Sequence, residues 1–507
     1  MLGKSIIYQI LPRLWGNPAK PVRGGSLKKN GCGHFSSVDE ATLDYLHGTL
    51  GVTHVWLTGV IRHACGEEGS SDWVKGLAGS PYAISDYFDV NPYLADNKAE
   101  RMSEFKQLVN RIHKAGMKVL IDFVPNHVAR NHSPFFGGAD NTSVHWHPDN
   151  DFFYYPGESL RLPFDSSYKE FPAKASGNAF TPAPGINDWF DTVKLNYCDF
   201  RTPTWDKMAE VLDFWCKKGV DGFRCDMVEL IPYQAMKWLI ETTKQKHPGT
   251  VFIAEVYQTG LYPLYSNEVG FDALYDKSGL YDTLRDIVTG RFSARGITAV
   301  WQMLGDLQPT MLNFLENHDE QRLASDFFAG SARRGYAALY VSLLLNTAPF
   351  MLYFGQEAGE RGMDEEGFSS LNGRTSIFDW WSPSSARILW AYIHSEKGLP
   401  SKEKSILKKY SELLQLARTP LFAEGKTYDL CYCNEGSAGF NPDRHFAFLR
   451  SHEGRTALVV ANFMDEDAEP QISIPAHALE YLGLEKLTLP GRIKVRVKAC
   501  DGKIINL

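Results

Sequence analysis

Short apolar runs alternate with amphipathic helical patterns over the first 420 residues of the chain. The runs that predict β-strands lie at 5–11, 53–59, 118–124, 220–225, 251–256, 271–276, 311–316 and 349–354. The segments between them predict helices, such as residues 204–219, where apolar residues recur at helical spacing before a glycine. Eight strands joined by helical crossovers indicate a parallel (β/α)8 barrel, the TIM-barrel fold.

Two regions depart from this alternation. The third and fourth strands begin about 100 residues apart, far more than the roughly 30 residues that a simple βα unit needs. We therefore expect a loop-rich inserted domain at 128–200, between two parts of the barrel at 1–127 and 201–420. After residue 420, runs of alternating apolar and polar residues predict a C-terminal antiparallel β domain, a β-sandwich, at 421–507.

Composition narrows the class of protein. The chain has 507 residues, 44% of them hydrophobic, and a net charge of −7, which argues against a nucleic-acid partner. No run approaches the roughly 18 apolar residues of a membrane span. The eight cysteines form no CxxC pair, and the N-terminal apolar stretch is too short for a signal peptide. We expect a soluble cytoplasmic protein with reduced cysteines; its oligomeric state stays open.

Polar side chains gather where the predicted strands end. The third strand ends in DFVPNH, the fourth in GFRCD, the fifth in AEVY and the seventh in ENHDE. Because catalytic residues of such barrels lie at the carboxyl ends of the strands, these motifs would bring four carboxylates to one rim. They are Asp122, Asp226, Glu255 and Asp319.

The motif GFRCD places Arg224 and Asp226 on the same face of a strand. One interpretation is a structural ion pair. The other is glycoside hydrolysis, which needs paired carboxylates and neither a metal nor a nucleotide. Asp226 would then be the attacking group, oriented by Arg224, and Glu255 the general acid. His127 and His318 can donate hydrogen bonds to sugar hydroxyls.

These motifs resemble those of the α-amylase family, glycoside hydrolase family 13. DFVPNH, GFRCD, IAEVY and FLENHD are similar to its four main motifs and occur in the family's order. VKLN at 193–196 resembles a short motif near the end of its inserted domain, and residues 82–92 resemble its second-strand loop. The resemblance extends from about residue 5 to 420 and more weakly beyond.

The resemblance implies a retaining double displacement with three catalytic carboxylates. Asp226 would be the nucleophile, Glu255 the acid/base, and Asp319 the group that binds sugar hydroxyls and stabilises the transition state. Substrate would be bound by Arg224, His127 and His318, with Tyr82 as the ring on which the sugar stacks. Asp122 would position Arg224.

The resemblance also raises the question of calcium, which many relatives bind between the barrel and the inserted domain. Asn126 and Asn196 match two of the ligand positions. Both are neutral, whereas calcium prefers some carboxylate, and Asn126 could instead cap a turn. Glu229 and Leu230 stand where the family often has a Lys-His pair that shapes the leaving-group side.

Three functions remain open from the sequence. The first is an α-glucan hydrolase acting on α-1,4 bonds in glycogen, starch or maltooligosaccharides. The second is an α-glucan transglycosylase or an α-1,6-acting glucosidase of the same family. The third is a non-catalytic glycan-binding protein, which the presence of all three catalytic carboxylates disfavours.

Overall fold

The fold of this chain was obtained as a computed structural model. It describes residues 2–66, 72–132, 146–198, 202–368, 370–395, 397–485, 487 and 489–507.

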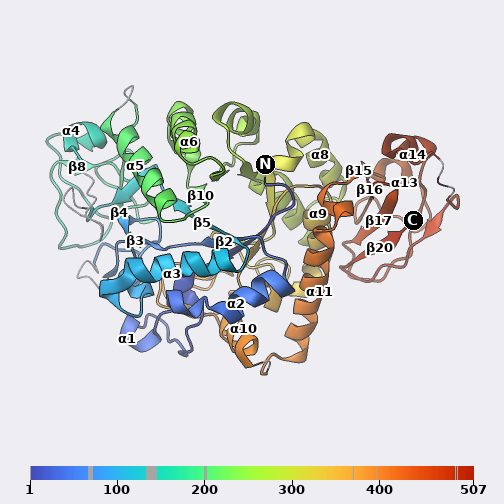
Figure 1. The fold of residues 1–507 in the computed structure, drawn as a ribbon, viewed down its shortest axis with the longest axis horizontal. Helices are drawn as coiled ribbons and strands as arrows, with labels where there is room; N and C mark the ends of the chain where they lie inside the picture. The colour runs from blue at the N-terminus through green and yellow to red at the C-terminus, as the bar shows by residue number, and fades with distance from the viewer. Residues whose placement is uncertain are drawn as a thin grey trace.

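Eight parallel strands close a barrel in chain order (Figure 1). They are β1 (Ile6–Ile10), β2 (His54–Leu57), β5 (Lys118–Phe123), β10 (Gly222–Cys225), β11 (Val251–Ala254), β12 (Ala273–Tyr275), β13 (Met311–Phe314) and β14 (Phe350–Tyr353). Each lies within one of the predicted apolar runs. The barrel fold predicted from the sequence is therefore confirmed.

Helices surround the barrel, and the amphipathic ones present an apolar stripe to the strands. In α3 (Arg101–Lys114), for example, Phe105, Leu108 and Ile112 are fully buried at helical spacing. The others are α1 (Leu27–Asn30), α2 (Glu40–Asp44), α5 (Pro203–Lys217), α6 (Tyr233–Lys246), α7 (Asp282–Val288), α8 (Arg295–Leu304), α9 (Tyr336–Leu344), α10 (Ser384–Ser395) and α11 (Ser401–Ala417). No helix among the described residues is both long and apolar enough to cross a membrane.

The segment between β5 and α5 leaves the barrel, and its described residues form short elements. They are β6 (His127–Ala129), α4 (Pro148–Asp151), β7 (Tyr154–Tyr155), β8 (Ala173–Lys174) and β9 (Thr192–Lys194). Strands β6 and β9 pair antiparallel, so the segment returns to the point where it left. A second excursion, β3 (Ile61–His63) and β4 (Ile84–Val90), follows β2.

The C-terminal region forms a four-stranded antiparallel sheet at the opposite end of the molecule from α4 (Figure 1). It contains β15 (Lys426–Asp429), β16 (His445–His452), β17 (Arg455–Asn462) and β20 (Gly502–Asn506). Beside it lie α12 (Pro420–Ala423), α13 (Cys431–Asn434), α14 (Ala476–Leu482) and a two-stranded sheet of β18 (Gln471–Ile472) and β19 (Ile493–Lys494). The antiparallel β domain is confirmed, and α14 lies between two of the runs that predicted it.

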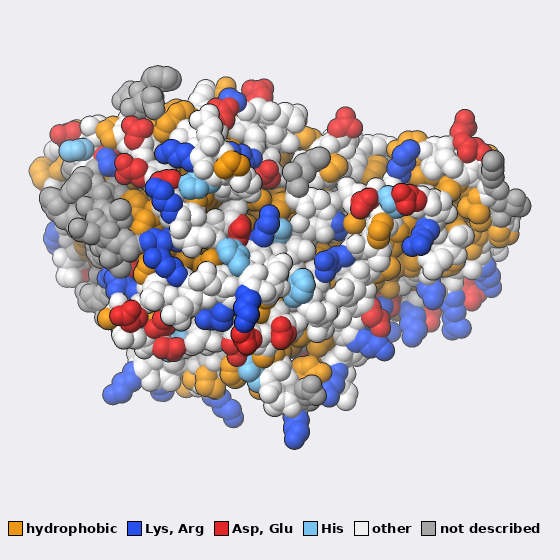
Figure 2. Space-filling model, viewed as in Figure 1, with side chains coloured by type: hydrophobic (Ala, Val, Ile, Leu, Met, Phe, Trp, Pro, Cys, Tyr) orange, Lys and Arg blue, Asp and Glu red, His pale blue; other side chains and the backbone are white. Residues whose placement is uncertain are grey.

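On the face shown in Figure 2, basic and acidic side chains are interspersed, in keeping with the small net charge.

Candidate active site

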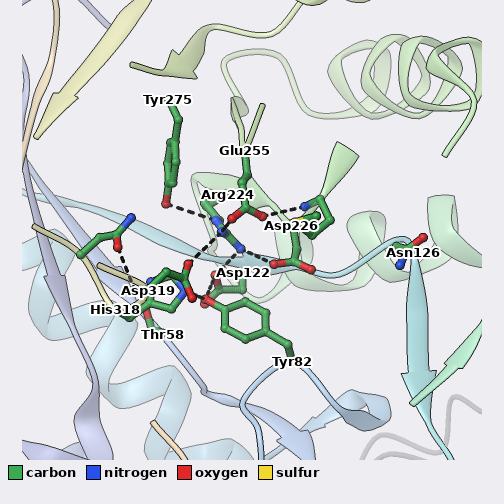
Figure 3. A network of polar contacts seen from close by, with 12 residues as sticks. Thr58, Tyr82, Asp122, Asn126, Arg224, Asp226, Glu255, Tyr275, His318 and Asp319 are labelled. Atoms are coloured by element: carbon green, nitrogen blue, oxygen red, sulfur yellow. Dashed lines mark hydrogen bonds and ion pairs between the residues drawn. The ribbon is translucent and has the colours of Figure 1, made fainter. Parts of the chain in front are cut away.

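The carboxylates predicted at strand ends come from neighbouring strands of the barrel. Asp122 lies in β5 and pairs in register with Arg224 of β10. Asp226 and Glu255 directly follow β10 and β11, and Asp319 lies in the loop after β13. Since parallel strands end at one rim, these side chains converge, as Figure 3 shows.

Arg224 is the centre of this cluster. Its Nη1 donates a hydrogen bond to Asp226 Oδ1 at 2.6 Å, and its Nη2 lies 2.7 Å from Glu255 Oε1 in an ion pair. Asp122 and Asp319 lie 3.7 and 4.0 Å from the same guanidinium. One arginine therefore serves four carboxyl groups.

The arginine side chain is fully buried. Its Nε donates to the hydroxyl of Tyr275 at 3.2 Å, so the guanidinium is held from the barrel interior as well. A buried cation is stable only when it is paired, and the surrounding carboxyls meet that requirement. The nearby acids in turn raise the pKa of Arg224, against the effect of its burial, so its charge is fixed.

Four acids around one arginine compete for positive charge. Burial and the neighbouring Glu255 raise the pKa of Asp226, and Arg224 opposes them. Burial also favours the neutral form of Asp319, but His318, Arg224 and Arg374 outweigh it and lower its pKa to about 2. Asp319 is therefore a fixed negative charge, whereas Asp226 ionises less readily than a free aspartate.

His318 and Tyr82 form a second layer of contacts. The Tyr82 ring stacks on His318, with centroids 5.2 Å apart, and its hydroxyl contacts His318 Nε2 at 2.5 Å and Asp122 Oδ1 at 3.2 Å. Gln9 from β1 contacts the other ring nitrogen of His318 at 2.8 Å. His318 covers one face of Tyr82, so the role of this ring as a sugar platform stays a prediction.

A cavity of about 370 Å³ opens onto the carboxylates. Asp226, Glu255, Asp319, Tyr82 and His127 line it, whereas Arg224 and His318, which were also predicted to bind substrate, do not. Burial and the nearby Lys194 and Lys75 lower the pKa of His127 to about 3, so its ring is neutral and can either donate or accept a hydrogen bond.

Several residues of this cavity were not singled out from the sequence. The Tyr257 hydroxyl donates to Glu255 Oε1 at 2.6 Å; this residue lies within the IAEVY motif, where its position two residues after the glutamate was the available signal. Lys75, Trp189, Asp191 and Arg374 come from loops that carry no strand-end signal. Asp191 is 1% exposed, and its Oδ2 has no partner among the described residues.

The described residues do not fit a calcium site at Asn126 and Asn196. The ammonium of Lys194 donates to Asn126 Oδ1 and to the carbonyl of Leu230, the latter at 2.6 Å. Asn196 Oδ1 accepts from the backbone N–H of Cys198 at 2.9 Å. A cationic side chain thus already occupies the oxygen that a metal would need. Asn126 also lies apart from the Arg224 network in Figure 3.

Comparison with known proteins places this site in a family. Residues 26–257 match the family model "Alpha amylase, catalytic domain", a range that includes Asp226 and Glu255. This segment belongs to the α-amylase family. The resemblance inferred from the four motifs is therefore confirmed, although Asp319 lies outside the matched range.

Individual relatives are distant. A cyclomaltodextrinase from Geobacillus thermopakistaniensis is 24% identical over 373 residues, which cover 71% of this chain and 56% of the relative. The chain thus spans about half the length of that relative. An amino acid transporter heavy chain from Homo sapiens is 27% identical over 265 residues, covering 48% of this chain and 32% of the relative. Membership of the family therefore does not by itself establish hydrolysis.

Solved structures support the fold over the whole chain. The crystal structure of a noncanonic maltogenic α-amylase from Thermotoga neapolitana matches with a TM-score of 0.63 at 22% identity. The match covers 99% of this chain and 96% of that one, so it includes the inserted and C-terminal regions.

Proposed function

We propose that the protein is a retaining α-glucan hydrolase that cleaves α-1,4-glucosidic bonds in glycogen, starch or maltooligosaccharides. The observation that carries the proposal is the pair of Asp226 and Glu255 on the two terminal nitrogens of one buried arginine, facing a cavity. Carboxyls that share one guanidinium lie close together. A separation of about 5–5.5 Å is typical of retaining enzymes, whereas inverting enzymes need a wider gap for water.

The reaction would proceed in two displacements. Asp226 attacks the anomeric carbon while the glycosidic bond breaks, and Glu255 gives its proton to the departing sugar oxygen. A water molecule then attacks the covalent glycosyl-enzyme, Glu255 takes the proton from that water, and the bond to Asp226 breaks. The anomeric configuration is inverted twice and so retained.

The other residues would prepare these steps. Arg224 orients both carboxyls and limits their mutual repulsion. Asp319, ionised and 39% exposed toward the cavity, would accept hydrogen bonds from sugar hydroxyls and stabilise positive charge on the ring. Asp122 accepts hydrogen bonds from the Tyr82 hydroxyl and the Trp56 indole N–H, and so fixes these two rings beside Arg224.

The names of relatives support an α-glucan substrate, since they include a cyclomaltodextrinase and a maltogenic α-amylase. They do not distinguish hydrolysis from transglycosylation, or α-1,4 from α-1,6 bonds. All eight cysteines are free in the structure, which suits the cytoplasmic location that is part of this proposal.

A proton NMR time course on maltoheptaose tests the proposal. We expect α-anomeric reducing ends to appear before mutarotation with the wild type. The Asp226→Asn variant should lose this activity, because it lacks the nucleophile. Asp276→Asn is the matched control: Asp276 is also a buried aspartate at a strand end, but its Oδ1 accepts from Leu280 N–H outside the cavity.

Each alternative has its own outcome. Longer oligosaccharides without new reducing ends would indicate a transglycosylase. Activity only on a branched glucan would indicate α-1,6 preference, and initial β-anomer would refute retention. Binding without any turnover would favour a non-catalytic glycan-binding protein.

A further inference from the structure

Glu229 lies outside the cavity lining, in the 3-10 turn Val228–Leu230 that follows β10. The resemblance to the family suggested that this position shapes the leaving-group side of the site. The Glu229 side chain contacts backbone instead. Its Oε2 accepts the backbone N–H of Tyr257 at 3.0 Å, and Oε1 accepts that of Gln258 at 2.9 Å. Both carboxylate oxygens therefore bind one short stretch of backbone.

That stretch carries the residue in contact with Glu255. The Tyr257 hydroxyl donates to Glu255 Oε1 at 2.6 Å, the same oxygen that Arg224 Nη2 faces. The Tyr257 ring is attached to the backbone that Glu229 fixes, so a shift of this backbone moves the hydroxyl.

The second oxygen of Glu255 is held from the same turn. Met227 N–H donates to Glu255 Oε2 at 2.8 Å. Met227 has φ 45° and ψ 47°, a left-handed conformation that side-chain-bearing residues rarely adopt. A strained residue persists only where its surroundings over-determine it, and Glu229, two residues on, ties this turn to the segment after Glu255.

We propose that Glu229 is a positioning residue for acid/base catalysis: by clamping the backbone of Tyr257 and Gln258 to the turn after β10, it fixes Glu255 in the orientation that proton transfer requires. The inference rests on the proposed hydrolase function. It assigns Glu229 no contact with the sugar.

The test compares two substrates that differ in their need for an acid. The glycosidic oxygen of maltoheptaose must be protonated as it leaves, whereas the fluoride of α-maltosyl fluoride leaves with little help from an acid. We expect Glu229→Ala to lower kcat/KM on maltoheptaose about tenfold or more, because general acid catalysis contributes about 10²–10⁴-fold and only its orientation is lost. On α-maltosyl fluoride the same variant should keep kcat/KM within about threefold, because kcat/KM reports the first displacement and not the later hydrolysis step in which Glu255 acts as a base.

Glu104 provides a matched control. Its Oε1 and Oε2 accept the backbone N–H groups of Asn97 and Asp96, both at 2.8 Å, away from the cavity. Glu104→Ala removes the same kind of clamp and should change the melting temperature without changing kcat/KM on either substrate.

A double variant tests whether Glu229 acts through Tyr257. Tyr257→Phe removes the hydroxyl, so adding Glu229→Ala to it should cost little more on maltoheptaose. Independent, additive losses would overturn the inference, as would an equal loss on both substrates with Glu229→Ala. In either case the hydrolase function would stand if the wild type turns over. No turnover of either substrate by the wild type would refute both.

Discussion

Replacing Arg224 by lysine would separate charge from geometry in the active site. A lysine ammonium keeps the positive charge but is a single point charge, so it cannot face Asp226 and Glu255 together as the two guanidinium nitrogens do. The variant also loses the donor to Tyr275. A hydrogen bond to a charged group contributes about 1.5–3 kcal/mol and a neutral one about 1, so we expect the free energy of unfolding to fall by about 2–4 kcal/mol.

Activity should fall more steeply than stability. Displacing the nucleophile or the acid by about 1 Å can cost about 100-fold in rate, and we expect at least that loss in kcat for Arg224→Lys on maltoheptaose. Urea unfolding and the release of reducing ends would measure the two effects under the same buffer conditions.

Arg450 offers the control for this experiment. It is also fully buried, but it donates to the carbonyls of Leu344, Phe422 and Gly425, each at 2.8 Å, in the C-terminal region. Arg450→Lys should lower stability and leave kcat nearly unchanged. If folded Arg224→Lys kept kcat within about tenfold of the wild type, the shared arginine could not be what aligns the two carboxyls.

Three further outcomes follow from the structure. Burial raises the pKa of Glu316 from 4.5 to about 8, so the folded chain holds a proton that the unfolded chain releases, and stability falls as pH rises between these values. The melting temperature of Glu316→Gln relative to the wild type should therefore increase from about pH 5 to about pH 8; a constant difference would contradict this. Chelation with EDTA should leave activity and melting temperature unchanged, because Lys194 supplies the positive charge beside Asn126; a fall in either would indicate a metal. Asp191→Ala should raise KM for maltoheptaose roughly tenfold if the free Oδ2 accepts a sugar hydroxyl, and an unchanged KM would rule that contact out.

The barrel could be predicted because its strands are short, mostly apolar runs. The segments between them have apolar residues at helical spacing. β10, for instance, is buried along its whole length, and its sequence is apolar apart from Arg224. The C-terminal region was harder: RIKVRVKA at 492–499 is one of the alternating runs that predict the C-terminal β domain, but within it the structure has a strand at Ile493–Lys494 alone. There, local alternation competes with tertiary pairing, and pairing decides.

The carboxylates of the site could be predicted for a related reason: strand order alone brings strand ends to one rim. The contacts of Lys194 could not, because its partners Asn126 and Leu230 are distant from it in the sequence. Asn126 and Lys194, for example, are 68 residues apart and meet only because β6 pairs with β9. Their partners depend on how the inserted segment returns to the barrel, which no local pattern encodes.

The two buried positive charges of this rim, Arg224 and Lys194, are side chains of the protein itself. Arg224 is one cation among four carboxyls, and burial together with the neighbouring Glu255 raises the pKa of Asp226 against the effect of this arginine. At the junction of barrel and inserted segment, the buried ammonium of Lys194 takes the place beside Asn126, and burial lowers its pKa to about 8. Because both cations are side chains, the charge state of the rim should depend on pH and not on the concentration of a divalent metal. Because burial lowers this pKa, the folded chain loses the Lys194 proton at a lower pH than the unfolded chain, so the contribution of this group to the free energy of unfolding should rise with pH above about 8.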